Sequence, residues 1–305
     1  MSDVKTKGRV IRSSLAVPGS NAHMMEKSLT VGADEIFFDL EDAVAPTARD
    51  KARTMVASML AEGGLGPHVQ AVRINAVGSG LAHKDITEIV EAGAEHLDRI
   101  ILPKARDARD VRFVDYLLTE IETALGLERR IGLEVLVESA SGAMHCMEIA
   151  TASSRVVGLI FGGGDYSADL GIERSIEFGI DRDATNWPKS VVVNAAVAAG
   201  VTPIDGPFPG LRDESGFRRA CVDAQRVGFR SKWCVHPAQV PWCNEAFGVN
   251  EADVELAKQL LAEYDRALAQ GLGAISFRGR LVDEATRKHA ERTVRLAQMA
   301  AGTES

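Results

Sequence analysis

The sequence predicts an α/β fold, and within that class a closed barrel of eight β/α units followed by a short C-terminal extension. Short apolar runs rich in β-branched residues alternate with longer amphipathic runs, which is typical of βαβ units and a parallel sheet. Several short runs, such as IILP and VVGLIF, are apolar throughout, as expected of strands buried on both faces. About eight such units can be counted, which favours a closed barrel over an open doubly wound sheet.

The expected strands are the short apolar runs Val10–Val17, Glu35–Leu40, Val69–Asn75, Arg99–Pro103, Ile131–Val137, Val156–Phe161, Val201–Ile204 and Ser231–Val235. Helical patterns separate these runs and follow the last one, at Asn21–Val31, Thr47–Glu62, His83–Ala92, Ala108–Leu125, Ser141–Thr151, Thr185–Ala199, Glu214–Arg226, Pro237–Phe247 and Glu251–Gln270. No linker rich in Pro, Gly or Ser divides these units. We therefore expect one catalytic barrel domain over residues 1–248.

The composition changes only after the long helical segment that ends near Gln270. The sequence GLGAISFRGRLVDEATRKHAERTVRLAQM is expected to form a short hairpin followed by a helix. Because this segment follows a finished barrel, residues 249–305 are expected to form a separate C-terminal helical extension.

Composition limits the possible functions and the compartment. Hydrophobic residues make up 46% of the chain and charged residues 26%, which is typical of a globular protein with a large core. The net charge of −8 argues against nucleic acid or an anionic membrane as a partner, although a local basic cluster could still bind an anionic substrate. The four cysteines form no CxxC pair, and no segment approaches the roughly 20 apolar residues of a membrane span, so the expected localisation is cytoplasmic.

Polar residues follow every expected strand. The active site of a barrel enzyme lies at the C-terminal ends of its strands, so these residues are the candidates for function. A single polar residue after a strand is at least as often a helix N-cap or a loop charge. The full set, which predicts an active site at this rim, is Pro18-Gly19-Ser20, Asp39-Leu40-Glu41-Asp42, Arg73-Ile74-Asn75, Pro103-Lys104, Glu138-Ser139, Gly162-Gly163-Gly164-Asp165-Tyr166, Asp205-Gly206 and His236-Pro237.

Glu138 and Asp165 are the candidate metal ligands. They lie one β/α unit apart, so a barrel would place them on adjacent strand ends. Two carboxylates, several waters and a chelating substrate suit Mg²⁺, with Mn²⁺ as a substitute. Glu41 and Asp42 could hold the metal-bound waters. From spacing alone, two solvated loop acids are an equally good interpretation.

Three basic residues and a glycine run have alternative interpretations. Arg73 and Arg12 are candidate anion-binding residues, because a guanidinium in an apolar strand needs an anionic partner; an internal ion pair with Asp39 or Glu41 is the alternative for Arg12. Lys104 could form a Schiff base, but an ion pair with the acidic strand ends is preferred. The FGGGD run matches no phosphate-binding motif, so its glycines are expected to let the backbone approach a ligand closely.

The motifs together resemble the HpcH/HpaI aldolase and citrate lyase β-subunit family, which includes malyl-CoA and citramalyl-CoA lyases. The resemblance runs from about Arg9 to the end of the chain and rests on RSSLAVPGSNAHMMEKS, FFDLEDAVAPTARDKAR, VRIN, LPK, VESASGAM, FGGGDYSADLG and KWCVHPAQV. DLEDAV and FGxxDYxxDLG are the specific motifs. One departure is VESASG where the family more often has IETxxG, which leaves the carboxylate of Glu138 in place.

The resemblance implies a metal-dependent (β/α)₈ TIM barrel that breaks or forms a carbon–carbon bond between a 2-oxo acid and an acyl-CoA. By motif, Glu138 and Asp165 match the Mg²⁺ ligands, and Arg73 matches the arginine that binds the oxo acid. Arg12 lies in the substrate-side motif, Glu138 also faces substrate, and Glu41 and Asp42 match acids near the metal.

The C-terminal extension resembles that of the longer family members, in which Asp283 matches an acid/base residue. Those members are homotrimers or homohexamers in which the extension covers a neighbouring subunit's active site. The short citrate lyase β-subunits lack it, which favours a free-standing enzyme here. The alternatives are a malyl-CoA thioesterase, an aldolase for CoA-free oxo acids, and a non-catalytic binding or regulatory subunit. Retention of Arg73, Glu138 and Asp165 argues against the last of these.

Overall fold

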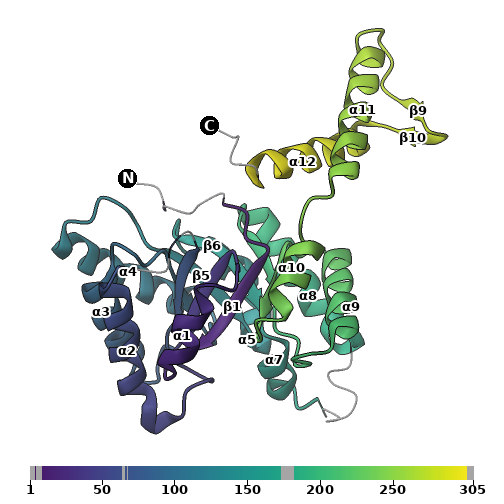
Figure 1. The fold of residues 1–305 in the computed structure, drawn as a ribbon. Coiled ribbons are helices and arrows are strands. Elements are labelled where there is room, and N and C mark those ends of the chain that lie inside the picture. Colours follow the sequence, from purple (N-terminus) through teal and green to yellow (C-terminus); the bar gives the residue numbers. More distant parts are fainter. Residues whose placement is uncertain (1–3, 5–8, 64–65, 67, 173–181, 301–305) are drawn as a thin grey trace. The chain divides into compact units, whose positions relative to one another are not determined.

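The computed structural model describes residues 4, 9–63, 66, 68–172 and 182–300 (Figure 1). The chain divides into two compact units, Met1–Phe247 and Gly248–Ser305. The first unit is the predicted barrel of eight parallel strands, closed by pairing of β1 with β8. Its strands are β1 (Ser13–Pro18), β2 (Glu35–Asp39), β3 (Val69–Arg73), β4 (Arg99–Leu102), β5 (Gly132–Val137), β6 (Val156–Phe161), β7 (Thr202–Asp205) and β8 (Ser231–Cys234).

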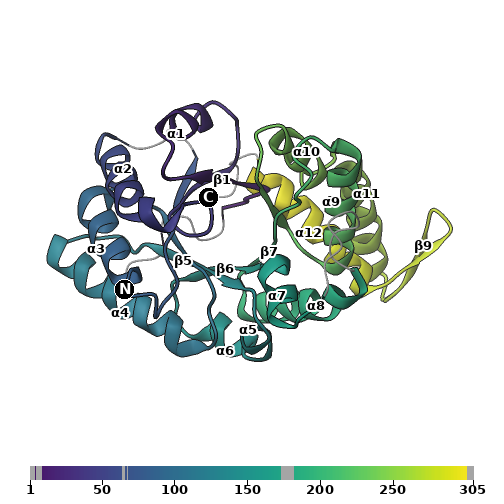
Figure 2. The same ribbon diagram turned by 90° about the horizontal axis from the view of Figure 1, so that it is seen from below.

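Helices cover the outside of this barrel, and Figure 2 shows them around the strands. They are α1 (Ala22–Ser28), the 3-10 turn η1 (Pro46–Ala48), α2 (Arg49–Ala61), α3 (Ala82–Gly93), α4 (Ala108–Leu125), α5 (Ala140–Met144), α6 (Cys146–Thr151), α7 (Gly163–Asp169), α8 (Arg182–Ala199), α9 (Glu214–Val227) and α10 (Gln239–Ala246). The strands and most helices lie where the periodicity predicted them, because each strand is buried on both faces and each helix buries one face.

Two helical regions differ from the prediction. The segment Ser141–Thr151 forms two helices, because the chain leaves helical geometry at His145, whose Nδ1 lies 2.9 Å from the Ser141 carbonyl oxygen. The glycine run after β6 was not among the expected helices, but it opens the helix α7. Burial of Tyr166 against Phe161 offsets the low helix propensity of glycine there, and Asp165 lies in the first turn of this helix.

The interior of the barrel is layered. Alternate residues of each strand point inward, and an apolar middle layer contains Ala16, Phe37, Ala71, Ile101, Leu136, Ile160, Ile204 and Trp233. Two residues earlier along their strands, Glu35, Arg99 and Glu134 form a buried ion cluster. Two residues later, Asp39, Arg73 and Glu138 reach the C-terminal rim. The apolar layer therefore separates two polar groups at opposite ends of the barrel.

The second unit consists of α11 (Glu251–Leu268), the antiparallel hairpin of β9 (Ile275–Phe277) and β10 (Arg280–Val282), and α12 (Glu284–Ala300). This is the predicted hairpin and final helix. Its small core contains Tyr264, Phe277 and Val282, and the Tyr264 hydroxyl donates to the Gly273 carbonyl oxygen at 2.9 Å. Among the residues that the structure describes, no helix has the length and apolar character needed to span a membrane.

Candidate active site

Arg73 and Asp39 form the base of a polar cluster at the C-terminal rim. They end neighbouring strands and are direct partners in the β2–β3 register. Arg73 Nε and Nη2 donate to the two Asp39 carboxylate oxygens at 2.7 and 2.6 Å, a bidentate pair. Burial lowers the pKa of Arg73, but the hydrogen bonds and charge of Asp39 outweigh it, so the pKa lies above its ordinary value. Arg73 is therefore a fixed cation.

Asp39 also fixes the loop that follows β2. Its carboxylate accepts hydrogen bonds at 2.9 Å from the backbone N–H groups of Glu41 and Ala43. The loop thereby brings Glu41 Oε2 to 3.5 Å and Asp42 Oδ2 to 3.7 Å from Arg73 Nη1. Because Nε and Nη2 are bound to Asp39, Nη1 is the guanidinium nitrogen that faces these acids.

Lys104 connects three of the candidate acids. Its ammonium lies 3.0 Å from Glu41 Oε1, 3.1 Å from Asp42 Oδ1 and 3.7 Å from Asp165 Oδ2. This is the predicted ion pairing with acidic strand ends. Burial lowers the pKa of Lys104, but the hydrogen bonds and charges of Glu41 and Asp42 raise it above its ordinary value, so the side chain stays charged.

Glu138 lies at the end of β5 with only 5% of its surface exposed. Its Oε1 accepts a hydrogen bond from the Lys104 backbone N–H at 2.8 Å. The backbone of Gly162 passes close by, and a Cβ there would lie 2.7 Å from Glu138 Oε2. Burial and the nearby charges of Asp165 and Glu41 raise the pKa of Glu138 well above its ordinary value. A bound cation would stabilise the ionised carboxylate.

The residues of this rim suit a single hard cation. Among the described residues of this rim, the carboxylates of Asp39, Glu41, Asp42, Glu138 and Asp165 lie near two cations, Arg73 and Lys104. Glu41 Oε2 is buried without a hydrogen-bond partner, and the Asp165 side chain is 47% exposed. In the described part of the chain, no three His, Cys, Asp or Glu side chains are placed to hold one ion. If Glu138 and Asp165 hold the ion, water and substrate would complete its shell, as is usual for Mg²⁺.

The structure places Arg12 elsewhere. It precedes β1, at the opposite end of the barrel from the rim, and donates from Nε and Nη2 to the Asp34 carboxylate at 2.7 and 2.8 Å. Its backbone N–H also donates to Asp34, so the strand begins at Ser13 and not at Val10. The partner is neither Asp39 nor Glu41, and we leave Arg12 out of the proposed site.

Asp283 lies in the second unit, between β10 and α12. Its Oδ1 accepts hydrogen bonds from the Thr286 backbone N–H at 3.0 Å and from the Thr286 hydroxyl at 3.1 Å, which is an N-cap of α12. These bonds lower the pKa of Asp283. The structure therefore shows Asp283 in a local role, as the N-cap of α12.

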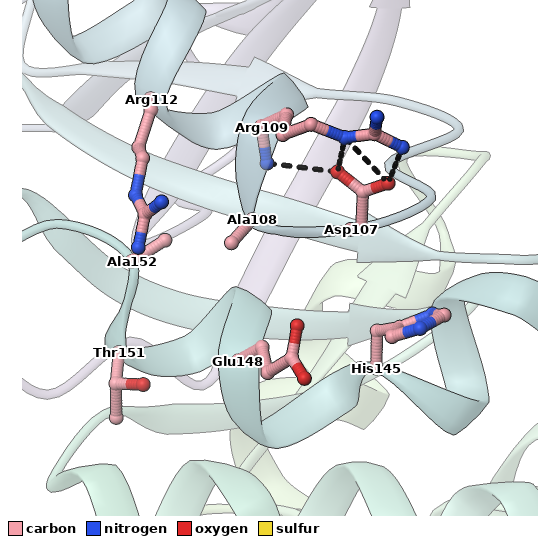
Figure 3. A pocket seen from close by; sticks show the side chains of 8 residues that line it. All are labelled: Asp107, Ala108, Arg109, Arg112, His145, Glu148, Thr151 and Ala152. Carbon is pink, nitrogen blue, oxygen red and sulfur yellow. Dashed lines mark hydrogen bonds and ion pairs between the residues drawn. The ribbon is translucent and has the colours of Figure 1, made fainter.

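A hollow of about 400 Å³ lies apart from these acids, between α4 and α6 (Figure 3). Asp107 and Arg109 pair with each other on one side of it, while Arg112 and Glu148 line other parts of the wall. None of the rim acids lines this hollow. The candidate site is therefore the rim cluster.

Sequence reasoning missed three parts of the cluster: the bidentate role of Asp39, the hydrogen bond from the Lys104 backbone to Glu138, and the close approach of Gly162. The first could have been found from the sequence, because Asp39 and Arg73 each end one of two consecutive strands. The other two depend on the loop backbone and leave no residue pattern.

The fold is that of an α/β-barrel enzyme, and the acidic rim is the candidate active site. A sequence profile of the HpcH/HpaI aldolase/citrate lyase family matches residues 12–237. The chain belongs to this family of carbon–carbon lyases.

Two relatives at the sequence level span nearly the whole chain. The L-malyl-CoA/beta-methylmalyl-CoA lyase of Rhodobacter capsulatus is 37% identical, over 96% of each chain. The citrate lyase subunit beta of Leuconostoc mesenteroides subsp. cremoris is 33% identical, over 95% of this chain and 94% of that protein. Because a citrate lyase β-subunit also spans almost all of this chain, the extension does not by itself indicate a free-standing enzyme, contrary to the expectation from the sequence.

Solved structures of proteins named CitE or citrate lyase are also similar to this chain. The protein CitE of Mycobacterium tuberculosis, in complex with magnesium, acetoacetate and coenzyme A, has a TM-score of 0.77 and 29% identity, and the match covers 95% of this chain and 98% of that chain. A citrate lyase from Burkholderia xenovorans has a TM-score of 0.85 at 21% identity, covers 100% of this chain and 96% of that chain, and supports the fold.

Proposed function

We propose that this chain is a Mg²⁺-dependent lyase that cleaves, or in reverse forms, a 3-hydroxy-3-carboxyacyl-CoA such as malyl-CoA or citramalyl-CoA. The products are a 2-oxo acid, glyoxylate or pyruvate, and an acyl-CoA. The observation that carries the proposal is the position of Arg73 Nη1, which faces a cluster of carboxylates that includes the buried Glu138. Burial and the neighbouring acids raise the pKa of Glu138, so a bound cation would stabilise its ionised form. The similarity to a malyl-CoA lyase over nearly the whole chain supports the CoA-ester substrate.

In this proposal Glu138 and Asp165 hold the metal, and Glu41 and Asp42 hold the waters around it. When bound, Mg²⁺ would act as a Lewis acid toward the substrate's carboxylate and hydroxyl oxygens. Manganese, which favours the same oxygen ligands, should substitute for it. The family likeness to CitE, which was crystallised with magnesium, supports this assignment.

Arg73 would bind the carboxylate of the oxo-acid unit through Nη1, while Asp39 holds the other two nitrogens. An acid/base residue takes up the hydroxyl proton, and the carbon–carbon bond then breaks. The bonding electrons then pass to the thioester side as an acyl-CoA enolate, which takes up a proton at carbon. Negative charge develops at oxygen in this step, and a fixed guanidinium stabilises it without reorganisation. We assign the acid/base role to Asp283, whose carboxylate takes up the hydroxyl proton and returns it to the enolate carbon.

The competing hydrolytic outcome is a thioesterase that releases malate and free CoA. Incubation with racemic malyl-CoA and citramalyl-CoA plus Mg²⁺, with 2-oxo acids trapped as hydrazones, separates the two. A lyase gives a hydrazone and an acyl-CoA in equal amounts. Release of CoA thiol without a 2-oxo acid from either substrate would overturn the proposal.

The metal assignment has its own test. EDTA treatment should abolish activity and added Mg²⁺ or Mn²⁺ should restore it in the wild type. Glu138→Gln keeps the shape of the side chain but removes its charge, so added metal should restore little activity in this variant. Full activity of Glu138→Gln, or of a rigorously metal-free wild type, would contradict the assignment.

A further inference from the structure

Lys104 adopts an unusual backbone conformation. Its φ of 52° lies in the left-handed region, which among the described non-glycine residues only Arg278 shares. A side chain in this region costs free energy that glycine would avoid, and such residues gather at functional sites. Both the backbone and the side chain of Lys104 make polar contacts. The backbone N–H donates to Glu138 Oε1 at 2.8 Å, and the side chain binds the neighbouring acids.

The ammonium group of Lys104 lies among oxygens that a divalent cation would need. It contacts Glu41 and Asp42 at 3.0 and 3.1 Å, and one of the two candidate metal ligands, Asp165, at 3.7 Å. A cation at this distance from a metal site repels the metal and competes for its ligands. The side chain is 40% exposed on a flexible stem, so it can withdraw from Asp165 and keep its contacts with Glu41 and Asp42.

We propose that Lys104 is a positioning residue that acts as a tethered competitor of the metal. Its ammonium partly neutralises the acidic cluster in the metal-free enzyme and weakens divalent-cation binding, so that the metal binds tightly only together with a chelating 2-oxo acid. The backbone N–H of the same residue holds Glu138 in place whether or not metal is bound. This inference rests on the proposed function, because it takes Glu138 and Asp165 as the metal ligands.

A purely structural role for Lys104 predicts the opposite result. If the ammonium only assembled the acids, its removal would scatter them and weaken metal binding. If it competes with the metal, its removal leaves the same oxygens with one positive charge fewer and tightens binding. Metal affinity in the absence of substrate therefore separates the two roles by its sign.

The experiment measures Mn²⁺ binding to the full-length protein from the electron paramagnetic resonance signal of free Mn²⁺, with and without glyoxylate. Lys104→Met removes the charge, and Lys104→Arg is the matched control that keeps it. Without glyoxylate, the methionine variant should bind Mn²⁺ at least about fivefold more tightly than wild type, a coupling within the usual range between two sites. Glyoxylate should tighten binding strongly in wild type and the arginine variant, and much less in the methionine variant.

A second variant without the charge is needed in case Lys104→Met does not fold correctly. Lys104→Gly suits the left-handed backbone, keeps the N–H that binds Glu138, and should reproduce the tighter Mn²⁺ binding. Equal or weaker binding in both charge-deleting variants would overturn the competitor role, while leaving the metal site intact. Absence of Mn²⁺ binding in wild type, with and without glyoxylate, would overturn the metal-dependent function and this inference with it.

Discussion

At the scale of single residues, Arg73 shows how a buried charge is made usable. Two of its three guanidinium nitrogens bind Asp39, and only Nη1 faces the acids where substrate would lie. The Asp39 carboxylate thus holds the planar guanidinium, while Nη1 is placed to donate to a substrate carboxylate. A lysine can supply the charge at this position but cannot make both contacts.

We therefore expect Arg73→Lys to lose turnover almost as fully as Arg73→Ala, by about 10²-fold or more, the usual effect of removing a fixed donor to a developing negative charge. Steady-state kinetics on malyl-CoA would measure this. Because either change removes the bidentate partner of the buried Asp39 carboxylate, the melting temperature of each variant should be recorded as well. A folded Arg73→Lys protein with near-normal turnover would indicate a merely electrostatic or structural role.

At the scale of elements, the junction of β6 and α7 places the Gly162 backbone against the Glu138 side chain. Gly162 lacks a side chain where a Cβ would lie 2.5 Å from the Glu138 Cβ and 2.7 Å from its Oε2. Gly162→Ala should therefore displace the carboxylate and raise the Mg²⁺ concentration needed for half-maximal activity by about 10- to 100-fold, as for other changes beside metal ligands. Gly273→Ala is the control, because no atom lies within 4 Å of its added Cβ. Equal Mg²⁺ requirements in the two variants would show that Glu138 does not depend on this contact.

The hairpin and α12 carry the second prediction at this scale. We propose that the extension of one subunit covers the active site of a neighbour in a homotrimer or homohexamer, and that Asp283 acts there as the acid/base. Asp283 also caps α12, and asparagine is as good an N-cap as aspartate. Asp283→Asn should thus preserve folding, oligomer size and metal binding while lowering turnover by about 10²–10⁴-fold, the effect of a lost acid/base.

Asp283→Ala provides the comparison, because it removes the cap as well and should also destabilise the extension. Mixing Asp283→Asn with Arg73→Ala, after subunit exchange, should recover part of the activity if the two residues of one site come from different subunits. Mixed oligomers without recovered activity would contradict action across an interface. A fully active Asp283→Asn protein would contradict the catalytic role itself.

At the scale of the whole molecule, periodicity was enough to predict the barrel, because eight buried strands and their helices each leave a repeated pattern in the sequence. The rim was predictable for the same reason: once strand ends are known, Glu41, Arg73 and Glu138 must lie at one end of the barrel. Arg12 was assigned to the strand because the apolar run begins near it, but its side chain and backbone N–H bind Asp34 at the opposite end. The helix α7 and the conformation of Lys104 depend on tertiary packing, which local propensity does not encode.

The ion cluster below the apolar layer gives a prediction about the stability of the whole barrel. Among the described residues, Glu35 and Glu134 are fully buried and pair with one cation, Arg99, whose Nη1 lies 3.0 Å from Glu35 Oε2 and also contacts Glu134. Two buried carboxylates with one cation cannot both ionise cheaply. Burial and the charge of Glu134 raise the pKa of Glu35 to about 8, although Arg99 and the Ser14 hydroxyl lower it.

In the unfolded chain the Glu35 carboxyl ionises near its ordinary pKa of 4.5. Between that pH and about 8 the folded protein holds a proton that the unfolded chain has released, so the group's contribution to stability is complete below 4.5 and is lost as pH rises to about 8. The loss has a limiting slope of about 1.4 kcal/mol per pH unit.

Glu35→Gln carries no titrating proton and should lack this slope. Urea unfolding of both proteins at several pH values measures it, and the difference between them removes the contributions of Glu41 and Glu138, whose pKa values are also raised. Because the apolar layer separates the cluster from the rim, the variant should keep its turnover. A stability difference that is constant across this pH window would mean that folded Glu35 holds no extra proton.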